Sequence, residues 1–160
     1  MRFIQGLLAL CALGGCMTTS QRPAVDPAKA ITLELVNETP EHRFSVGTFD
    51  GSRDCRGRRM EVPMTSDVGR LTLRIEPRSH QTVSYQFLGA FGDAKCGGTY
   101  TFETPQAPAR YRLRMTQGRD GCRFTVHRLE AGEETEVPLV TRAMRKKETE
   151  GAWCAADDRF

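Results

Sequence analysis

The sequence predicts an all-β protein built as an antiparallel β-sandwich of about seven to eight strands. Apolar and polar residues alternate with a period of two through most of the chain after residue 30, as in strands with one buried face. Glycine and proline clusters separate the alternating segments, and four cysteines are spread along them. Together these features favour a disulfide-stapled sandwich with almost no helix.

The first half of this region contains four alternating segments. Asn37 to Glu41 separates the first two, and its Pro40 indicates a turn. Pro77 to His80 separates the last two, and we expect it to connect them as a hairpin. The apolar positions of the four segments are Ile31, Leu33 and Leu35; Phe44 and Val46; Leu71, Leu73 and Ile75; and Val83, Tyr85 and Phe87.

The second half contains four more alternating segments. Gly89 to Gly98 is expected to form a long loop that holds Cys96, and Gln117 to Gly121 a turn. Gly132 to Glu134 is expected to form an acidic turn, and residues 142–150 a charged helical turn or two. The apolar positions of the strands are Tyr100 and Phe102; Tyr111, Leu113 and Met115; Phe124 and Val126; and Val137 and Leu139.

The N-terminal residues have the features of a secretion signal. Arg2 precedes an apolar run that ends at Leu13-Gly14-Gly15-Cys16, and this run is too short to span a bilayer core of about 30 Å. These last four residues resemble the lipobox of bacterial lipoproteins, which implies cleavage before Cys16 and acylation of Cys16. An ordinary signal peptide with an unmodified Cys16 is the alternative.

The resemblance divides the chain into three parts. Residues 1–15 are expected to be the signal peptide, residues 16–30 the lipidated N-terminus and a flexible tether, and residues 31–160 a single β-sandwich domain. In proteobacterial lipoproteins an aspartate after the cysteine favours retention in the inner membrane. Met17 stands there instead, so the resemblance implies an outer-membrane protein, on either the periplasmic or the surface side.

The cysteines of the body agree with an oxidising compartment. Cys55, Cys96, Cys122 and Cys154 form an even set, and two disulfides are expected. We predict the pairs Cys55–Cys96 and Cys122–Cys154, because the first two lie in long glycine-containing loops and the last fixes an otherwise untethered tail beside Trp153. A zinc site lacks the usual close ligand spacing.

Other sites of common chemistry are not favoured. Asp50, Ser52, Asp54 and Glu61 have calcium-loop spacing, but Cys55 stands where that loop needs glycine and four arginines surround the site. The histidines His42, His80 and His127 belong to no catalytic motif. We therefore expect neither a metal nor another cofactor, and no enzymatic activity.

One strand carries a stripe of arginines. Arg110, Arg112 and Arg114 alternate with apolar residues and share one face, and Arg123 on the return strand is expected to join them. This stripe is a candidate surface for anions such as lipid phosphates. The alternative is a solvated face whose charge is balanced by glutamates on neighbouring strands.

The body resembles, in strand rhythm and cysteine use, the transthyretin-like and immunoglobulin-like domains of small periplasmic lipoproteins. Because no catalytic motif is present, we expect a membrane-anchored, non-catalytic binding or envelope-assembly module with a protein partner, similar to the outer-membrane lipoprotein of type VI secretion. An inhibitor resembling lysozyme-blocking lipoproteins is the alternative, and a hydrolase is a weaker one. The net charge of +3 gives no indication of nucleic-acid binding.

Overall fold

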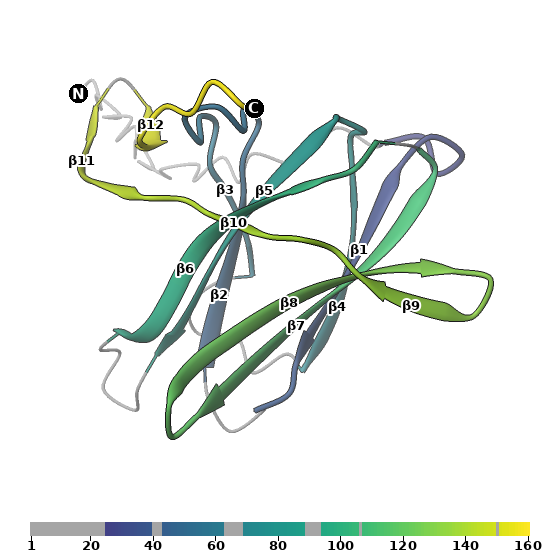
Figure 1. The fold of residues 1–160 in the computed structure, drawn as a ribbon, viewed down its shortest axis with the longest axis horizontal. Coiled ribbons are helices and arrows are strands. Elements are labelled where there is room, and N and C mark those ends of the chain that lie inside the picture. The colour runs from purple at the N-terminus through teal and green to yellow at the C-terminus, as the bar shows by residue number, and fades with distance from the viewer. Residues whose placement is uncertain (1–24, 40–42, 63–68, 89–93, 106, 150) are drawn as a thin grey trace, which may run out of the picture.

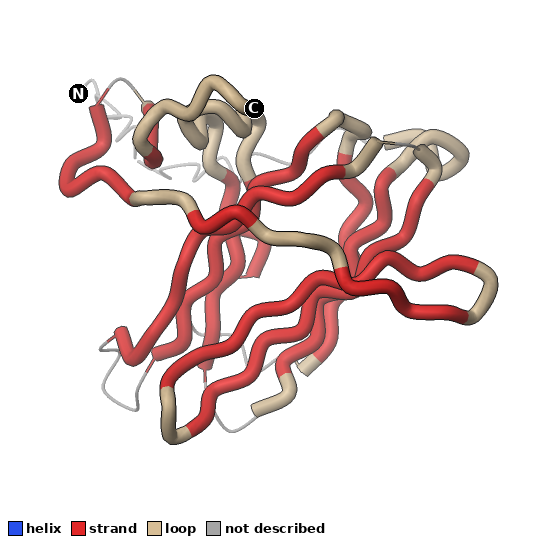
Figure 2. The backbone as a smooth tube through the Cα atoms, in the orientation of Figure 1, coloured by secondary structure: helices blue, strands red, loops and turns tan. Residues whose placement is uncertain are grey.

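The computed structural model describes residues 25–39, 43–62, 69–88, 94–105, 107–149 and 151–160. These residues form strands joined by turns and loops, and none of them is helical (Figure 2). The strands are β1 (Ile31–Asn37), β2 (Arg43–Thr48), β3 (Arg59–Val62), β4 (Arg70–Ile75), β5 (His80–Leu88), β6 (Ala94–Glu103), β7 (Ala109–Gly118), β8 (Gly121–Glu130), β9 (Glu133–Glu136), β10 (Val140–Thr141), β11 (Met144–Thr149) and β12 (Ala152–Cys154).

Ten of the strands form two five-stranded sheets (Figure 1). Sheet A has the order β4-β1-β7-β8-β9, and sheet B has the order β10-β6-β5-β2-β3. Neighbouring strands are antiparallel except β1 and β7, which are parallel. The predicted all-β, disulfide-stapled, sandwich-like class is therefore confirmed, although the twelve strands exceed the expected seven to eight.

The core lies between the two sheets and uses the alternation seen in the sequence. Leu33 of β1 and Leu113 of β7 are fully buried from one sheet, and Val46 and Phe87 from the other. The rings of Tyr85, Tyr100 and Phe124 stack with centroids 4.9 to 5.8 Å apart. Since Phe124 belongs to sheet A and the two tyrosines to sheet B, this stack joins the sheets.

The expected hairpin at Pro77 to His80 is wrong. The strands on either side of it lie in different sheets: β4 pairs with β1, whereas β5 pairs with β2 and β6. The short connection therefore turns a corner of the sandwich, where the Gln81 side chain donates to the carbonyl oxygen of Glu76 at 2.9 Å. Alternation identifies the buried face of each strand but not the partner of that strand.

The expected loop at Gly89 to Gly98 is also wrong in its second half. Strand β6 begins at Ala94, so Cys96, Gly97 and Gly98 are paired with β5. A Cβ at Gly97 would collide with the carbonyl oxygen of Tyr85. The glycine allows close contact between two strands here, and is not a loop signal. Residues 89–93 lie outside the described part.

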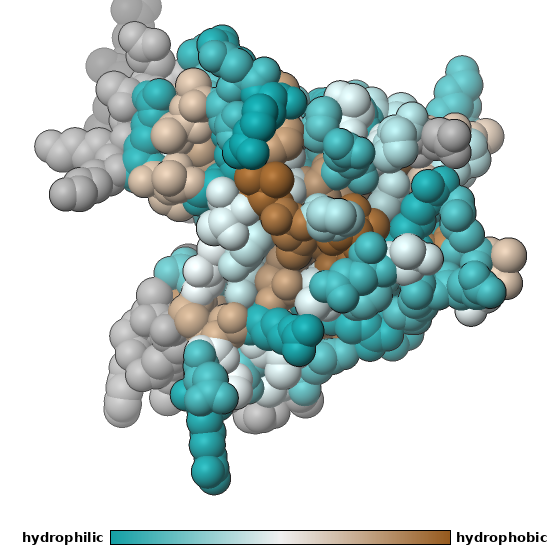
Figure 3. Space-filling view, viewed as in Figure 1, coloured by the Kyte–Doolittle hydropathy of each residue, from teal (hydrophilic) through white to brown (hydrophobic). Residues whose placement is uncertain are grey.

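The C-terminal third differs most from expectation. The predicted strand at Val137 and Leu139 is instead the connection from β9 to β10, which carries the chain from sheet A to sheet B (Figure 1). Both residues are half-buried against the core, which explains their apolar character. In the space-filling view, brown apolar atoms show in the middle of the face where this connection crosses (Figure 3). The expected acidic turn is shorter, because Glu133 already begins β9, and the expected helical tail is strand β11.

The disulfide pairing differs from the predicted one. The bonds are Cys55–Cys154 and Cys96–Cys122. Because Cys96 lies in a strand beside the core and faces Cys122 of β8, this bond joins the two sheets. Cys55 is thereby left for the C-terminal segment, so the expectation that Cys154 pins the tail back on the body is confirmed with a different partner.

The last residues of the expected tether form a local turn before β1. Within the expected tether, the Asp26 carboxylate accepts the Ala28 N–H at 3.0 Å and its carbonyl oxygen accepts the Lys29 N–H. Ala30 is buried. Residues 26–29 themselves are exposed. The predicted signal peptide and Cys16 lie outside the described residues.

Candidate functional site

The outer face of sheet A is the most strongly charged surface that the structure organises. Outward positions of β7 carry Arg110, Arg112 and Arg114, because the residues between them are buried in the core. The register places Glu34 of β1 beside Arg112, with His127 of β8 on its other side. Charges of both signs thus lie next to one another across the strands.

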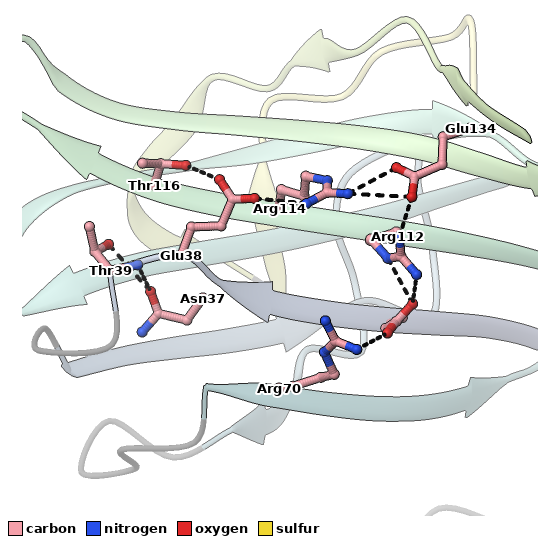
Figure 4. Close-up of polar contacts among 9 residues, drawn as sticks. Asn37, Glu38, Thr39, Arg70, Arg112, Arg114, Thr116 and Glu134 are labelled. Carbon is pink, nitrogen blue, oxygen red and sulfur yellow. Dashed lines mark hydrogen bonds and ion pairs between the residues drawn. The ribbon is translucent and has the colours of Figure 1, made fainter.

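These side chains form one chain of ion pairs (Figure 4). Glu34 forms an ion pair with Arg70 at 3.1 Å and another with Arg112 at 2.7 Å. Arg112 also pairs with Glu134, which in turn binds Arg114 at 3.0 Å. The chain ends at Glu38, which accepts from Arg114 at 2.9 Å and from the Thr116 hydroxyl at 2.8 Å. We call the six charged residues Glu34, Glu38, Arg70, Arg112, Arg114 and Glu134 the ionic network.

The ionic network is neutral, with three cations and three anions. Its hydrogen bonds stabilise the charged forms: Arg114 lowers the pKa of the Glu38 carboxyl and, with Arg112, that of Glu134. The two glutamates raise the pKa of Arg114 in return. Glu34 is only 9% exposed, so its two arginine partners satisfy a carboxylate that burial would otherwise destabilise.

A broad cleft of about 730 Å³ lies over one end of this network. Glu38, Arg114 and Glu134 line it together with Glu136 and His127. The Nδ1 atom of His127 is buried and makes no hydrogen bond with a described residue. The cleft itself presents fixed charges of both signs, a surface suited to a polar partner of complementary charge.

The structure separates the four arginines of the predicted anion-facing surface. Arg112 and Arg114 are half-buried members of the ionic network. Arg110 and Arg123 are exposed and lie outside it. Arg123 pairs in register with Thr116, six residues from Arg110, which corresponds to about 20 Å along the strand. The glutamates of neighbouring strands thus balance the centre of the stripe, as the alternative interpretation of the sequence expected.

The other candidate residues do not converge. His80 lies in β5, where Ser79 contacts its Nδ1 atom at 3.1 Å, and His127 lies in the other sheet. Of the residues with calcium-loop spacing, Asp50 pairs with Arg59 and Asp54 with Arg56. No group of three metal-binding side chains occurs in the described ranges. His42 lies outside them.

The sequence suggested balancing glutamates on neighbouring strands as an alternative, but it could not identify them, because they lie on strands distant in sequence. Glu34 belongs to β1, Glu38 directly follows β1, and Glu134 belongs to β9. The parallel pairing of β1 with β7 brings residues about eighty positions apart into contact. Alternation at β1 indicated only that Glu34 faces away from the core.

The comparisons with known proteins identify no relative: no family model, curated protein or solved structure matches this chain. In the part of the chain that the structure describes, no helix is long and apolar enough to cross a bilayer. The fold and the site geometry are therefore the basis for the functional argument.

Proposed function

We propose that this chain is a lipoprotein anchored to the outer membrane through Cys16, and that its β-sandwich is a non-catalytic binding module for a protein of the cell envelope. The observation that carries the proposal is the pair of disulfides. All four cysteines of the body after Cys16 are bonded, which is typical of proteins in oxidising compartments. This chemistry supports export of the chain, as the lipobox-like residues Leu13-Gly14-Gly15-Cys16 imply.

The ionic network is the proposed contact surface for the protein partner. Its side chains are already held by mutual ion pairs, so less conformational entropy is lost when a partner contacts them. The cleft above it presents Glu136 and His127 beside the network. A partner with complementary charges would gain specificity and association rate from this arrangement.

Metabolic labelling tests the anchor. Cells that express the wild-type chain and are fed a radiolabelled fatty acid should produce a labelled protein, and a Cys16→Ala variant should produce none. A Cys11→Ala variant is the matched control, because Cys11 lies within the apolar run and should not affect labelling. Equal labelling of the wild type and the Cys16→Ala variant would contradict the anchor.

Co-purification tests the binding module. Thr125 of β8 lines the cleft, and tyrosine at this position keeps a strand-favouring side chain while it fills the space. Partners cross-linked in the envelope and identified by mass spectrometry should be lost from Thr125→Tyr. Thr141→Tyr is the control, because Thr141 is exposed on sheet B and does not line the cleft. Unchanged partners in both variants would exclude the ionic face as the contact surface.

A further inference from the structure

The exposed large apolar side chains of the described residues gather at one corner of the molecule. Met60 of β3 and Met144 of β11 are each 45% exposed. Two clefts, of about 350 and 420 Å³, lie beside them and share Arg58 and Trp153 in their walls. We call Arg58, Met60, Met144 and Trp153 the Trp153 patch.

The cation within this patch is held in place. The guanidinium carbon of Arg58 lies 4.4 Å from the centroid of the Trp153 ring, a cation–π contact. Gly47 lies beneath Arg58, and a Cβ there would be 3.2 Å from its Nε atom. The glycine thus lets the arginine lie close to the outer face of sheet B, with its charge next to the tryptophan at the molecular surface.

Further cations follow directly along the chain. Met144 is succeeded in β11 by Arg145, Lys146 and Lys147, and Arg145 is exposed. Strands β11 and β12 form a separate two-stranded ribbon at the edge of the molecule, outside sheets A and B (Figure 1). Because Ala152 and Cys154 of β12 are buried, contact with a flat surface would fall on β11 and would not disturb either large sheet.

We propose that the Trp153 patch and the cationic strand β11 dock on an anionic phospholipid surface. Tryptophan next to lysine and arginine is the composition of membrane interfaces, where the apolar part enters the headgroup region and the cations meet phosphate. Charge complementarity favours this occupant, because strand β11 contains three cations, Arg145, Lys146 and Lys147, against one acid, Glu148. The proposal rests on the proposed lipid anchor, which would hold the domain close enough for weak contacts to act.

This location differs from the lipid-facing surface that the sequence suggested. The arginine stripe lies on the outer face of sheet A, whereas the Trp153 patch lies beside the outer face of sheet B. On sheet A, glutamates already neutralise the central arginines. The Trp153 patch instead combines cations with exposed apolar side chains.

The single tryptophan of the chain provides a direct probe. The mature chain with Cys16→Ser, which carries no acyl group, is mixed with vesicles of phosphatidylcholine containing one-third phosphatidylglycerol. Trp153 emission should shift to shorter wavelength and be quenched by brominated lipids at low salt. Both effects should weaken steeply as salt is added, and vesicles of phosphatidylcholine alone should produce neither.

Two surface variants locate the contact. Arg145→Ala should weaken vesicle binding about fivefold, since one cation near an anionic surface contributes about 1 kcal/mol. Met144→Ser should weaken it several-fold and reduce quenching. Arg119→Ala is the charge-matched control, because Arg119 is exposed in the distant β7–β8 turn, and it should bind as the parent does.

The outcomes distinguish this proposal from the proposed function. Absence of Trp153 quenching at low salt, or equal binding by Arg145→Ala, Met144→Ser and the parent, would overturn the docking surface. Loss of an envelope protein partner from Met144→Ser, without vesicle binding by the parent, would assign the patch to a protein instead. Because the vesicle test uses an unacylated chain, its result does not depend on whether Cys16 is labelled by a fatty acid.

Discussion

Cys55 and Cys154 are 99 residues apart in sequence, yet their Cα atoms are 5.3 Å apart and a disulfide joins them. The bond lies in a small second cluster with Phe49 and Trp153, separate from the main core. It therefore fixes the C-terminal segment to the loop between β2 and β3. This segment carries the proposed membrane-docking strand, so the bond also determines where that strand lies.

Removal of this disulfide should destabilise the protein strongly. In the chain-entropy model a loop of about 100 residues contributes about 4.7 kcal/mol, and the 26-residue separation of Cys96 and Cys122 corresponds to between about 3 and 4 kcal/mol. The Cys55→Ser/Cys154→Ser variant should thus unfold at lower urea than the Cys96→Ser/Cys122→Ser variant. The reverse order would show that the link between the sheets matters more than loop length.

Arg142 should be essential for holding the same C-terminal segment against the rest of the domain. It is 5% exposed, and its guanidinium donates to Thr101 Oγ1 at 3.0 Å and to the carbonyl oxygens of Ser52, Arg53 and Ala155. Arg142→Met leaves these buried acceptors without their donor, so the free energy of unfolding should fall by about 3 kcal/mol. Arg119→Met, at an exposed turn, should change it by less than about 0.5 kcal/mol. Equal urea midpoints would contradict this role.

The ionic network should make the free energy of unfolding depend on pH. The folded-state pKa values of Glu38 and Glu134 lie below the ordinary value of 4.5. Their contribution is therefore present above that value and is lost as pH falls through the lower folded pKa. The free energy of unfolding measured with urea should fall as the pH is lowered below about 4.5, and this fall should be smaller in high salt. Arg114→Met should flatten this dependence, and an unchanged slope would argue against the network.

The hypothesis of an anion-facing arginine stripe can be tested at its two exposed ends. Because the ionic network neutralises Arg112 and Arg114, only Arg110 and Arg123 would remain for phosphate. We expect the Arg110→Ala/Arg123→Ala variant to bind anionic vesicles within about twofold of the parent, since the two cations lie far apart. A larger loss, with a smaller dependence on salt, would support the stripe as a phosphate surface.

Local patterns in the sequence predicted the fold class and most strand positions. Alternation at Tyr111, Leu113 and Met115 marked β7 correctly because each residue faces a dry core on one side. The missed elements have other physical causes. Met144 to Thr149 forms a strand although its sequence is mostly charged, because it pairs with β12, which the Cys55–Cys154 bond fixes to the loop between β2 and β3.

The site could be predicted only in part. The outward direction of Arg110, Arg112 and Arg114 followed from their spacing, whereas their glutamate partners depend on the parallel pairing of β1 and β7. The prediction of the disulfide pairs was wrong for the same reason. Sequence placed Cys96 in a loop near Cys55, but strand pairing places it in β6, opposite Cys122 of the facing sheet.

The lipid anchor at Cys16 is tested by mass spectrometry of the N-terminus of the mature protein, purified from the outer-membrane fraction. The first residue should be Cys16, and this residue should carry added acyl mass. A mature chain that retains Met1, or that begins at an unmodified Cys16 or at another residue, would contradict a lipid anchor at this position.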